Sequence, residues 1–220
     1  MSDGKLRLGA VLYPGFEMLD MFGPLEMFSL LGPDAVKITM VAESLEPVPA
    51  AMGVDLTSGP RVTVDASFDD AGQFDVLLIP GGFGTMPQLE NDAMISFLRK
   101  HGATASQVCS VCTGSLLLAR AGLLDGRKAT TNKQFFGLTE TESADIDWQP
   151  EARWVQDGKL FTSSGVSAGM DMALALIQHL LGPETAEAIA VSAEYSWHRD
   201  AAVDPFARHL NEGMAALSGS

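Results

Sequence analysis

The sequence predicts an α/β protein built on a mainly parallel sheet, and two patterns support this prediction. Apolar runs over residues 6–13, 36–42 and 74–79 end at turn residues and are hydrophobic at most positions, as strands are in a sheet covered on both faces. Segments with helical periodicity alternate with these runs, which is typical of parallel βαβ units. The helices predicted in this half of the chain are 25–31, 91–101 and 115–124.

The second half of the chain adds a small antiparallel element to this arrangement. Asp157-Gly158 is a signal for a two-residue type I′ turn, so the segments on either side of it should form a hairpin. Gly182-Pro183 should separate two closing helices, because proline cannot continue a helix and glycine favours its end. The remaining predicted elements are the strand Gln107–Val111, the hairpin strands Ala152–Gln156 and Lys159–Ser163, and the helices Ser167–Leu181 and Glu184–Trp197.

Length and charge limit the classes of function. The chain should form a single domain over residues 1–220, with an ordered core over about residues 5–206 and a flexible C-terminal tail that includes Leu217–Ser220. A formal net charge of −14 argues against nucleic acid or a membrane surface as a partner. No apolar run approaches the roughly 18 residues of a membrane span, and residues 1–5 lack the apolar region of a secretory signal. We therefore expect a cytoplasmic protein.

The two cysteines, Cys109 and Cys112, are spaced C-x-x-C around the end of a predicted strand. Cys112 is followed by Thr113-Gly114-Ser115 and a helix, and a nucleophilic side chain at a strand-to-helix turn is the arrangement of a nucleophile elbow. The positive end of the following helix would favour the thiolate. Cys109 should lie on the opposite face of the strand, in the core. A purely structural Cys112 and a redox-active cysteine pair are the alternatives.

Two glycine-rich segments have plain structural interpretations. Pro80-Gly81-Gly82-Phe83-Gly84 follows a strand and could place backbone amides in a ligand-binding crevice, but a tight turn without ligand is the better explanation. It is not a phosphate-binding loop, so we expect no nucleotide cofactor. Gly165-Val166-Ser167-Ala168-Gly169 matches the serine hydrolase pattern G-x-S-x-G, yet too little α/β structure follows to supply an acid and a histidine. We therefore interpret Ser167 as a helix N-cap.

Asp20 stands among Met18, Leu19, Met21 and Phe22. A carboxylate in apolar surroundings is costly unless it is paired, protonated or functional. A solvated acid or a helix cap is the alternative. Aromatic candidates for a pocket are Phe83, Phe135, Phe136 and Trp197, although aromatic residues at such spacing are more often core.

Four segments together resemble the ThiJ/PfpI family, in particular its isonitrile hydratase-like branch. They are Tyr13–Asp20, Leu78–Gly82, Ser110–Gly114 and Ser164–Asp171, in the order that the family has them. The resemblance covers about residues 5–206 and implies a flavodoxin-like, three-layer α/β sandwich of the glutamine-amidotransferase type, usually dimeric. It implies no cofactor or metal.

The resemblance also implies roles for individual residues. Cys112 would be the nucleophile, Asp20 the acid beside it, and the backbone N–H groups of Gly82 and Thr113 oxyanion-hole-like donors. In the isonitrile hydratase branch the thiolate attacks the isonitrile carbon, and water converts the resulting thioimidate into an N-substituted formamide. An ionised Asp20 would repel the thiolate, so we expect a protonated Asp20 and a Cys112 of low pKa.

One position departs from the family pattern. Many members have a histidine after the Thr-Thr that follows the elbow helix, whereas this chain has Thr130-Thr131-Asn132, and Asn132 cannot act as a base. Protease or amidase chemistry with a Cys-His pair is therefore disfavoured. The alternatives to isonitrile hydration are aldehyde or glyoxal detoxification with the same cysteine, and stress sensing through oxidation of Cys112 to a sulfinic acid.

Overall fold

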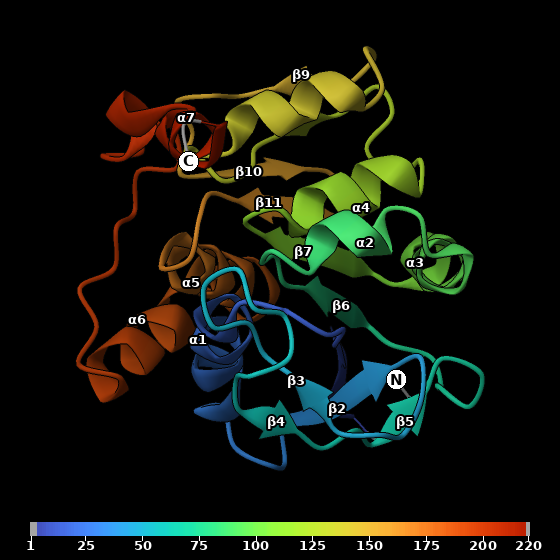
Figure 1. Ribbon diagram of the computed structural model, residues 1–220. Helices are drawn as coiled ribbons and strands as arrows, with labels where there is room; N and C mark the ends of the chain where they lie inside the picture. The colour runs from blue at the N-terminus through green and yellow to red at the C-terminus, as the bar shows by residue number, and fades with distance from the viewer. Residues whose placement is uncertain (1–3, 219–220) are drawn as a thin grey trace.

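The protein is described by a computed structural model that covers residues 4–218, and its centre is a seven-stranded sheet (Figure 1). The strand order is β10-β11-β7-β6-β1-β2-β5, and every neighbouring pair is parallel except β10 and β11. The strands are β1 Leu6–Val11, β2 Val36–Ala42, β3 Val48–Pro49, β4 Arg61–Val62, β5 Ala66–Ser67, β6 Val76–Ile79, β7 Gln107–Val111, β8 Lys128–Ala129, β9 Asp147–Trp148, β10 Trp154–Asp157 and β11 Leu160–Ser163.

Helices cover both faces of the sheet. Helices α1, α5 and α6 pack together on one side, and α2, α3 and α4 on the other (Figure 1). The helices are α1 Met18–Ser29, α2 Thr85–Gln88, α3 Asp92–Thr104, α4 Gly114–Arg120, α5 Ala168–Leu181, α6 Pro183–Ser192 and α7 Glu212–Ser218, with 3₁₀ helices η1 Phe136–Thr141 and η2 Ala207–His209. The three-layer α/β fold predicted from the sequence is confirmed. Within residues 4–218, no helix is both long and apolar enough to cross a membrane.

The predicted hairpin is also confirmed. Strands β10 and β11 pair antiparallel from Trp154↔Ser163 to Asp157↔Leu160, and Gly158 in the turn has a φ of 59°. Strand β11 then pairs in parallel with β7, so the hairpin joins the main sheet at its edge. This pairing places the carboxyl end of β11 beside the turn that follows β7.

Helix α1 starts earlier than predicted, at Met18, and continues through Pro24. Proline has no N–H to donate to the carbonyl of Asp20, which normally ends or kinks a helix. Here Met21, Leu25 and Phe28 are buried and α1 packs on α5, so tertiary burial offsets the missing hydrogen bond. The longer helix places Asp20 in its first turn, facing the interior.

The C-terminal part of the chain contains helical structure that the sequence patterns did not predict. Helix α6 ends at Ser192 and not at Trp197, because the chain turns through Glu194 in the left-handed region at a φ of 49°. Helix α7 includes part of the segment predicted to be disordered, and residues 219–220 lie outside the described residues. Backbone hydrogen bonds from Asn211 to Lys133 and from Met214 to Gln134 hold this end of the chain against the body.

Candidate active site

Cys112 occupies the turn between β7 and α4, where its backbone has a φ of 57°. Residues other than glycine seldom adopt this conformation, and such strain is concentrated at functional sites. The Cys112 amide donates to the carbonyls of Ser163 and Ser164 at the end of β11, each at 3.2 Å. A Cβ on Gly114 would lie 2.5 Å from the Pro80 carbonyl oxygen, so this position requires glycine. The structure therefore has the elbow geometry predicted for Cys112.

Asp20 lies beneath this turn and is completely buried. Its Oδ2 accepts a hydrogen bond from the Gly81 amide at 2.8 Å. Burial raises the pKa of Asp20 to about 8, and the charge of Glu17 adds to this; hydrogen bonds from the Gly81 amide, the Cys112 thiol and the Val166 amide lower the pKa in part. The carboxyl group is therefore mostly protonated at neutral pH, as the sequence led us to expect.

The expectation of a low pKa for Cys112 is wrong. The side chain is buried beside Asp20, and burial raises the pKa of the Cys112 thiol above its usual range, with the charge of Asp20 as the next cause. Hydrogen bonds from Asn132 and Thr113 lower the pKa but do not compensate for burial. The helix dipole that motivated our expectation comes from α4, which has only seven residues. At neutral pH the site thus holds a neutral thiol next to a carboxyl group that is mostly protonated.

The two predicted oxyanion donors differ in their availability. The Gly82 amide donates to Thr113 Oγ1 at 3.1 Å and is therefore engaged by a side chain. Thr113 Oγ1 also lies 2.9 Å from Thr85 Oγ1, which lies 3.1 Å from the buried Tyr13 hydroxyl. The Thr113 amide and hydroxyl both lower the pKa of Cys112 through hydrogen bonds. For Gly82 to bind a substrate oxygen, the Thr113 hydroxyl would have to rotate away.

Asn132 also contacts the sulfur, which sequence reasoning did not foresee. Its Nδ2 donates a hydrogen bond to Cys112 Sγ at 3.1 Å. The sequence showed only that this residue replaces the family histidine and cannot be a base. The sequence signal that could have revealed this contact is the position of Asn132 directly after Thr131. The Thr131 hydroxyl donates to the Cys112 carbonyl at 2.9 Å and so holds this segment next to the elbow.

A cavity of about 420 Å³ opens above Cys112, and its lining is mainly apolar. Phe83 and Phe135 form an edge-to-face pair at 5.8 Å, so two of the four aromatic candidates lie at this site and Phe136 and Trp197 do not. The lining residues are Glu17, Gly82, Phe83, Met86, Cys112, Thr113, Asn132, Gln134, Phe135, Leu138, Val166 and Met214. The cavity therefore fits a small, uncharged, largely apolar molecule at the thiol.

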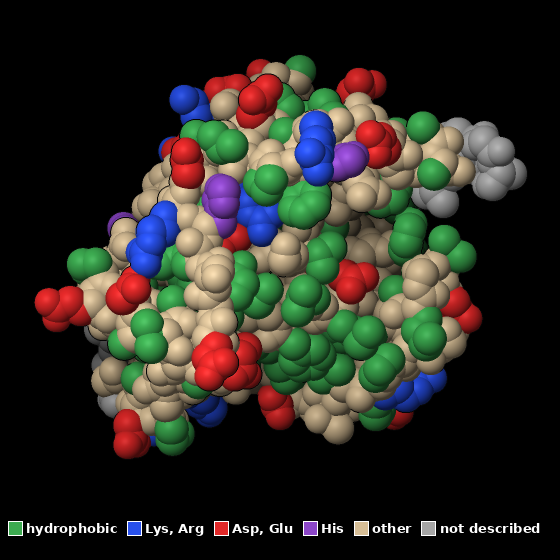
Figure 2. Space-filling model, turned by 90° about the vertical axis from the view of Figure 1, so that its left-hand side faces the viewer, with side chains coloured by type: hydrophobic (Ala, Val, Ile, Leu, Met, Phe, Trp, Pro, Cys, Tyr) green, Lys and Arg blue, Asp and Glu red, His purple; other side chains and the backbone are tan. Residues whose placement is uncertain are grey.

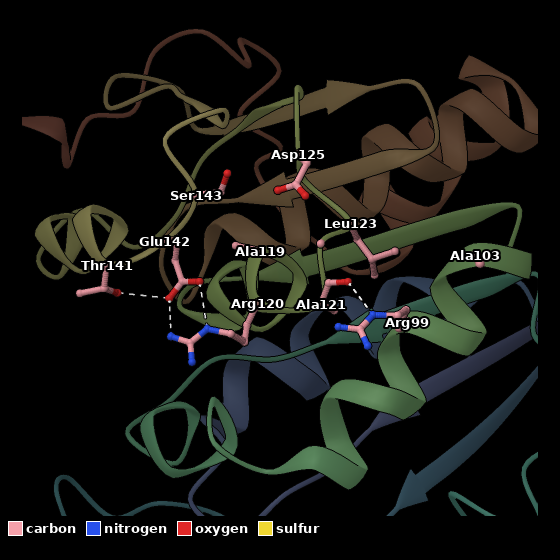
Figure 3. A pocket seen from close by; sticks show the side chains of 11 residues that line it. Arg99, Ala103, Ala119, Arg120, Ala121, Leu123, Asp125, Thr141, Glu142 and Ser143 are labelled. Carbon is pink, nitrogen blue, oxygen red and sulfur yellow. Dashed lines mark hydrogen bonds and ion pairs between the residues drawn. The ribbon is translucent and has the colours of Figure 1, made fainter.

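A second hollow, of about 610 Å³, lies beside α3 and α4 (Figure 3). Arg120, which lines this hollow, forms ion pairs with Glu90 and Glu142. Arg99, also in the lining, donates a hydrogen bond to the Ala121 carbonyl (Figure 3). None of the predicted site residues lines this hollow. Among the described residues, no group of three or more His, Cys, Asp or Glu side chains is placed to hold a metal ion.

The G-x-S-x-G segment has a structural role. Ser167 precedes α5 but makes no side-chain cap, so the predicted capping bond is absent; its hydroxyl instead accepts from Arg153 at 3.2 Å. Arg153 also forms ion pairs with Asp171 and Asp204, and all three are buried. Because Arg153 is a permanent cation and no base, Ser167 is not activated as a nucleophile.

Comparison with known proteins identifies the family. Residues 9–179 match the model of the DJ-1/PfpI family. The chain belongs to this family. The ThiJ/PfpI resemblance predicted from the four segments is therefore confirmed.

Individual relatives of this DJ-1/PfpI protein differ in what they do. It is 39% identical over 191 residues to an isonitrile hydratase from Pseudomonas putida, covering 87% of this chain and 79% of that protein. It is 27% identical to the HTH-type transcriptional regulator CdhR from Pseudomonas aeruginosa, covering 84% of this chain and 53% of the regulator. A crystal structure of a ThiJ/PfpI family protein from Pseudomonas syringae superposes with a TM-score of 0.76 at 33% identity, covering 88% of this chain and 76% of that one.

Proposed function

We propose that this protein hydrates a small, largely apolar isonitrile to its N-substituted formamide, with Cys112 as nucleophile and Asp20 as acid and base. The observation that carries the proposal is a neutral thiol that lines an apolar cavity and is hydrogen-bonded to a fully buried carboxyl group whose pKa is raised to about 8. None of the four histidines lines this cavity, which favours chemistry that needs only a thiol, one acid and water. The identity to isonitrile hydratase supports the same reaction.

In the first step Asp20 gives its proton to the isonitrile carbon while Cys112 Sγ bonds to that carbon. The thiol proton passes to the carboxylate, so Asp20 is protonated again and the product is a neutral thioimidate, Cys–S–CH=N–R. A carboxyl group suits this step because one oxygen can donate a proton while the other accepts one. Neither group has to stay charged in a buried site, which would be costly.

In the second step water adds to the thioimidate carbon, and Asp20 relays one water proton to the nitrogen. The C–S bond then breaks, the hydroxyl becomes the formyl oxygen, and its proton returns to sulfur. The sum is R–NC plus H₂O giving R–NH–CHO, with the enzyme unchanged. Hydrogen bonds from the Thr113 amide and, once released, the Gly82 amide would stabilise the tetrahedral intermediate.

The test is turnover of alkyl and aryl isonitriles by the purified protein, with the formamide quantified by chromatography. We expect formamide to appear in proportion to enzyme. Methylglyoxal is assayed in parallel, because an aldehyde-detoxifying enzyme would use the same thiol. Consumption of methylglyoxal without any formamide production would overturn the proposal.

Met214 should set the size of the accepted substrate. It reaches the cavity from α7 and lies over Gly137, where an added Cβ would come within 2.9 Å of its sulfur. We expect Met214→Ala to lower kcat/KM for a small alkyl isonitrile about ten-fold, because roughly three buried heavy atoms of contact are lost, and to lower it less for a bulky aryl isonitrile. Val191→Ala, an exposed change on α6 away from the cavity, is the control. An unchanged size preference in Met214→Ala would contradict this role.

We also propose that two copies of the chain associate through the exposed face of α1. Met18, Leu19 and Phe22 are each about two-fifths exposed there, and Figure 2 shows hydrophobic side chains gathered on the side of the molecule that carries α1. Exposed Met52 lies in a loop held next to this face by the hydrogen bond from the Ala51 amide to the Phe16 carbonyl. Sedimentation velocity should give a dimer that Phe22→Glu converts to monomer, and a monomeric wild type would refute the arrangement.

A further inference from the structure

The amide of Asn132 is held in one orientation by the backbone around it. Its Oδ1 accepts hydrogen bonds from the amides of Gln134 at 2.9 Å and Phe135 at 3.3 Å. A carboxamide whose oxygen is bound to two N–H donors must present its NH₂ group on the other side. That side faces Cys112 Sγ at 3.1 Å, so the NH₂ group donates to sulfur and the inverted orientation is excluded.

The NH₂ group of Asn132 fits beside the sulfur only because the neighbouring residue 165 is a glycine. Gly165 follows β11, and a Cβ at this position would lie 2.4 Å from Asn132 Nδ2. Any larger residue there would push the amide away from sulfur. On the other side, the Thr131 hydroxyl donates to the Cys112 carbonyl, so the segment that carries Asn132 is tied to the elbow itself.

We propose that Asn132 is a further catalytic residue, which stabilises the Cys112 thiolate by hydrogen-bond donation and leaves Asp20 to receive the thiol proton. This role rests on the proposed function, since it concerns the same nucleophile. A carboxamide has donor hydrogens toward sulfur but no basic atom there, unlike an imidazole. The thiol proton therefore cannot move to residue 132, and it passes to the Asp20 carboxylate that is left once Asp20 has protonated the isonitrile carbon.

The thiolate chemistry can be measured without an isonitrile. The rate of Cys112 alkylation by iodoacetamide is followed as a function of pH, with peptide mapping to separate Cys112 from Cys109. Asn132→Asp keeps an oxygen that accepts from the Gln134 and Phe135 amides but removes the donor to sulfur. We expect this variant to be alkylated about ten- to a hundred-fold more slowly at pH 7, with a profile displaced upward by about one to two pH units.

Two further variants separate the donor from other effects. Gly165→Ala retains Asn132 but displaces its NH₂ group, and should slow alkylation in the same direction. Asn91→Asp is a matched control, because Asn91 Oδ1 accepts from the amides of Ala93 and Met94 at 3.0 and 3.3 Å in the same way but far from the cavity. It should be alkylated at the wild-type rate.

If folded Asn132→Asp is alkylated at the wild-type rate at every pH, the assignment is overturned, because Asn132 would then only shape its turn. That result would leave isonitrile turnover by the wild type untouched. Conversely, slow alkylation of Asn132→Asp together with no formamide production by the wild type would preserve the role of Asn132 and reject the proposed substrate. The two proposals therefore fail separately.

Discussion

Cys112→Ala should abolish formamide production, with a loss of at least about 10⁴-fold in kcat, because covalent catalysis has no substitute for its nucleophile. The variant should fold, since alanine is smaller than cysteine and tolerates the φ of 57° no worse. Cys112→Ser retains the shape but exchanges the thiol for a much less acidic hydroxyl, and should be nearly as inactive. The measurement is isonitrile turnover, with circular dichroism to establish folding.

The outcome that would contradict this prediction is a folded Cys112→Ala variant with turnover within ten-fold of the wild type. The nucleophile would then be another group, and Ser167→Ala would be the next variant to assay. Cys109→Ala is the matched control, because Cys109 is equally buried but does not line the cavity. We expect it to retain activity.

Asp20→Ala should lower kcat by about 10²- to 10⁴-fold, the range for removal of a general acid and base. Asp20→Asn should be comparably slow although it can still donate a hydrogen bond, because a carboxamide cannot transfer a proton. Activity should also fall above about pH 8, where the carboxyl group loses the proton that the first step requires. A wild-type rate in Asp20→Asn would show that Asp20 only positions the thiol.

The same carboxyl group makes stability depend on pH. Its pKa is about 8 in the folded protein against an ordinary value of 3.8, so between these values the unfolded chain has released a proton that the folded chain keeps. Raising the pH through this window therefore favours unfolding, by up to about 1.4 kcal/mol per pH unit. Asp20→Asn removes this contribution. The difference in unfolding free energy between variant and wild type should shift by up to about 4 kcal/mol between pH 5 and pH 8, measured by denaturant titration. A constant difference would disprove the raised pKa.

Local patterns determined much of the fold. Strands Val36–Ala42 and Gln107–Val111 have the bounds that their apolar runs predicted, and Asp157-Gly158 makes the hairpin turn that its backbone preference demands. Helix ends were less predictable, as α1 shows: local chemistry places a break at Pro24, and packing on α5 overrides it.

The candidate site likewise has features that local sequence determines and features that depend on tertiary packing. The sequence by itself determined that Cys112 lies at a strand-to-helix turn and that Asp20 sits among apolar residues, because both follow from neighbours along the chain. Only the tertiary structure decided that Asn132 donates to the sulfur, that Met214 lines the cavity and that the Gly82 amide is engaged. These contacts join segments distant in sequence. The raised pKa of Cys112 was likewise decided by the tertiary structure, because burial depends on all the residues packed around the thiol and not only on its neighbours in the sequence.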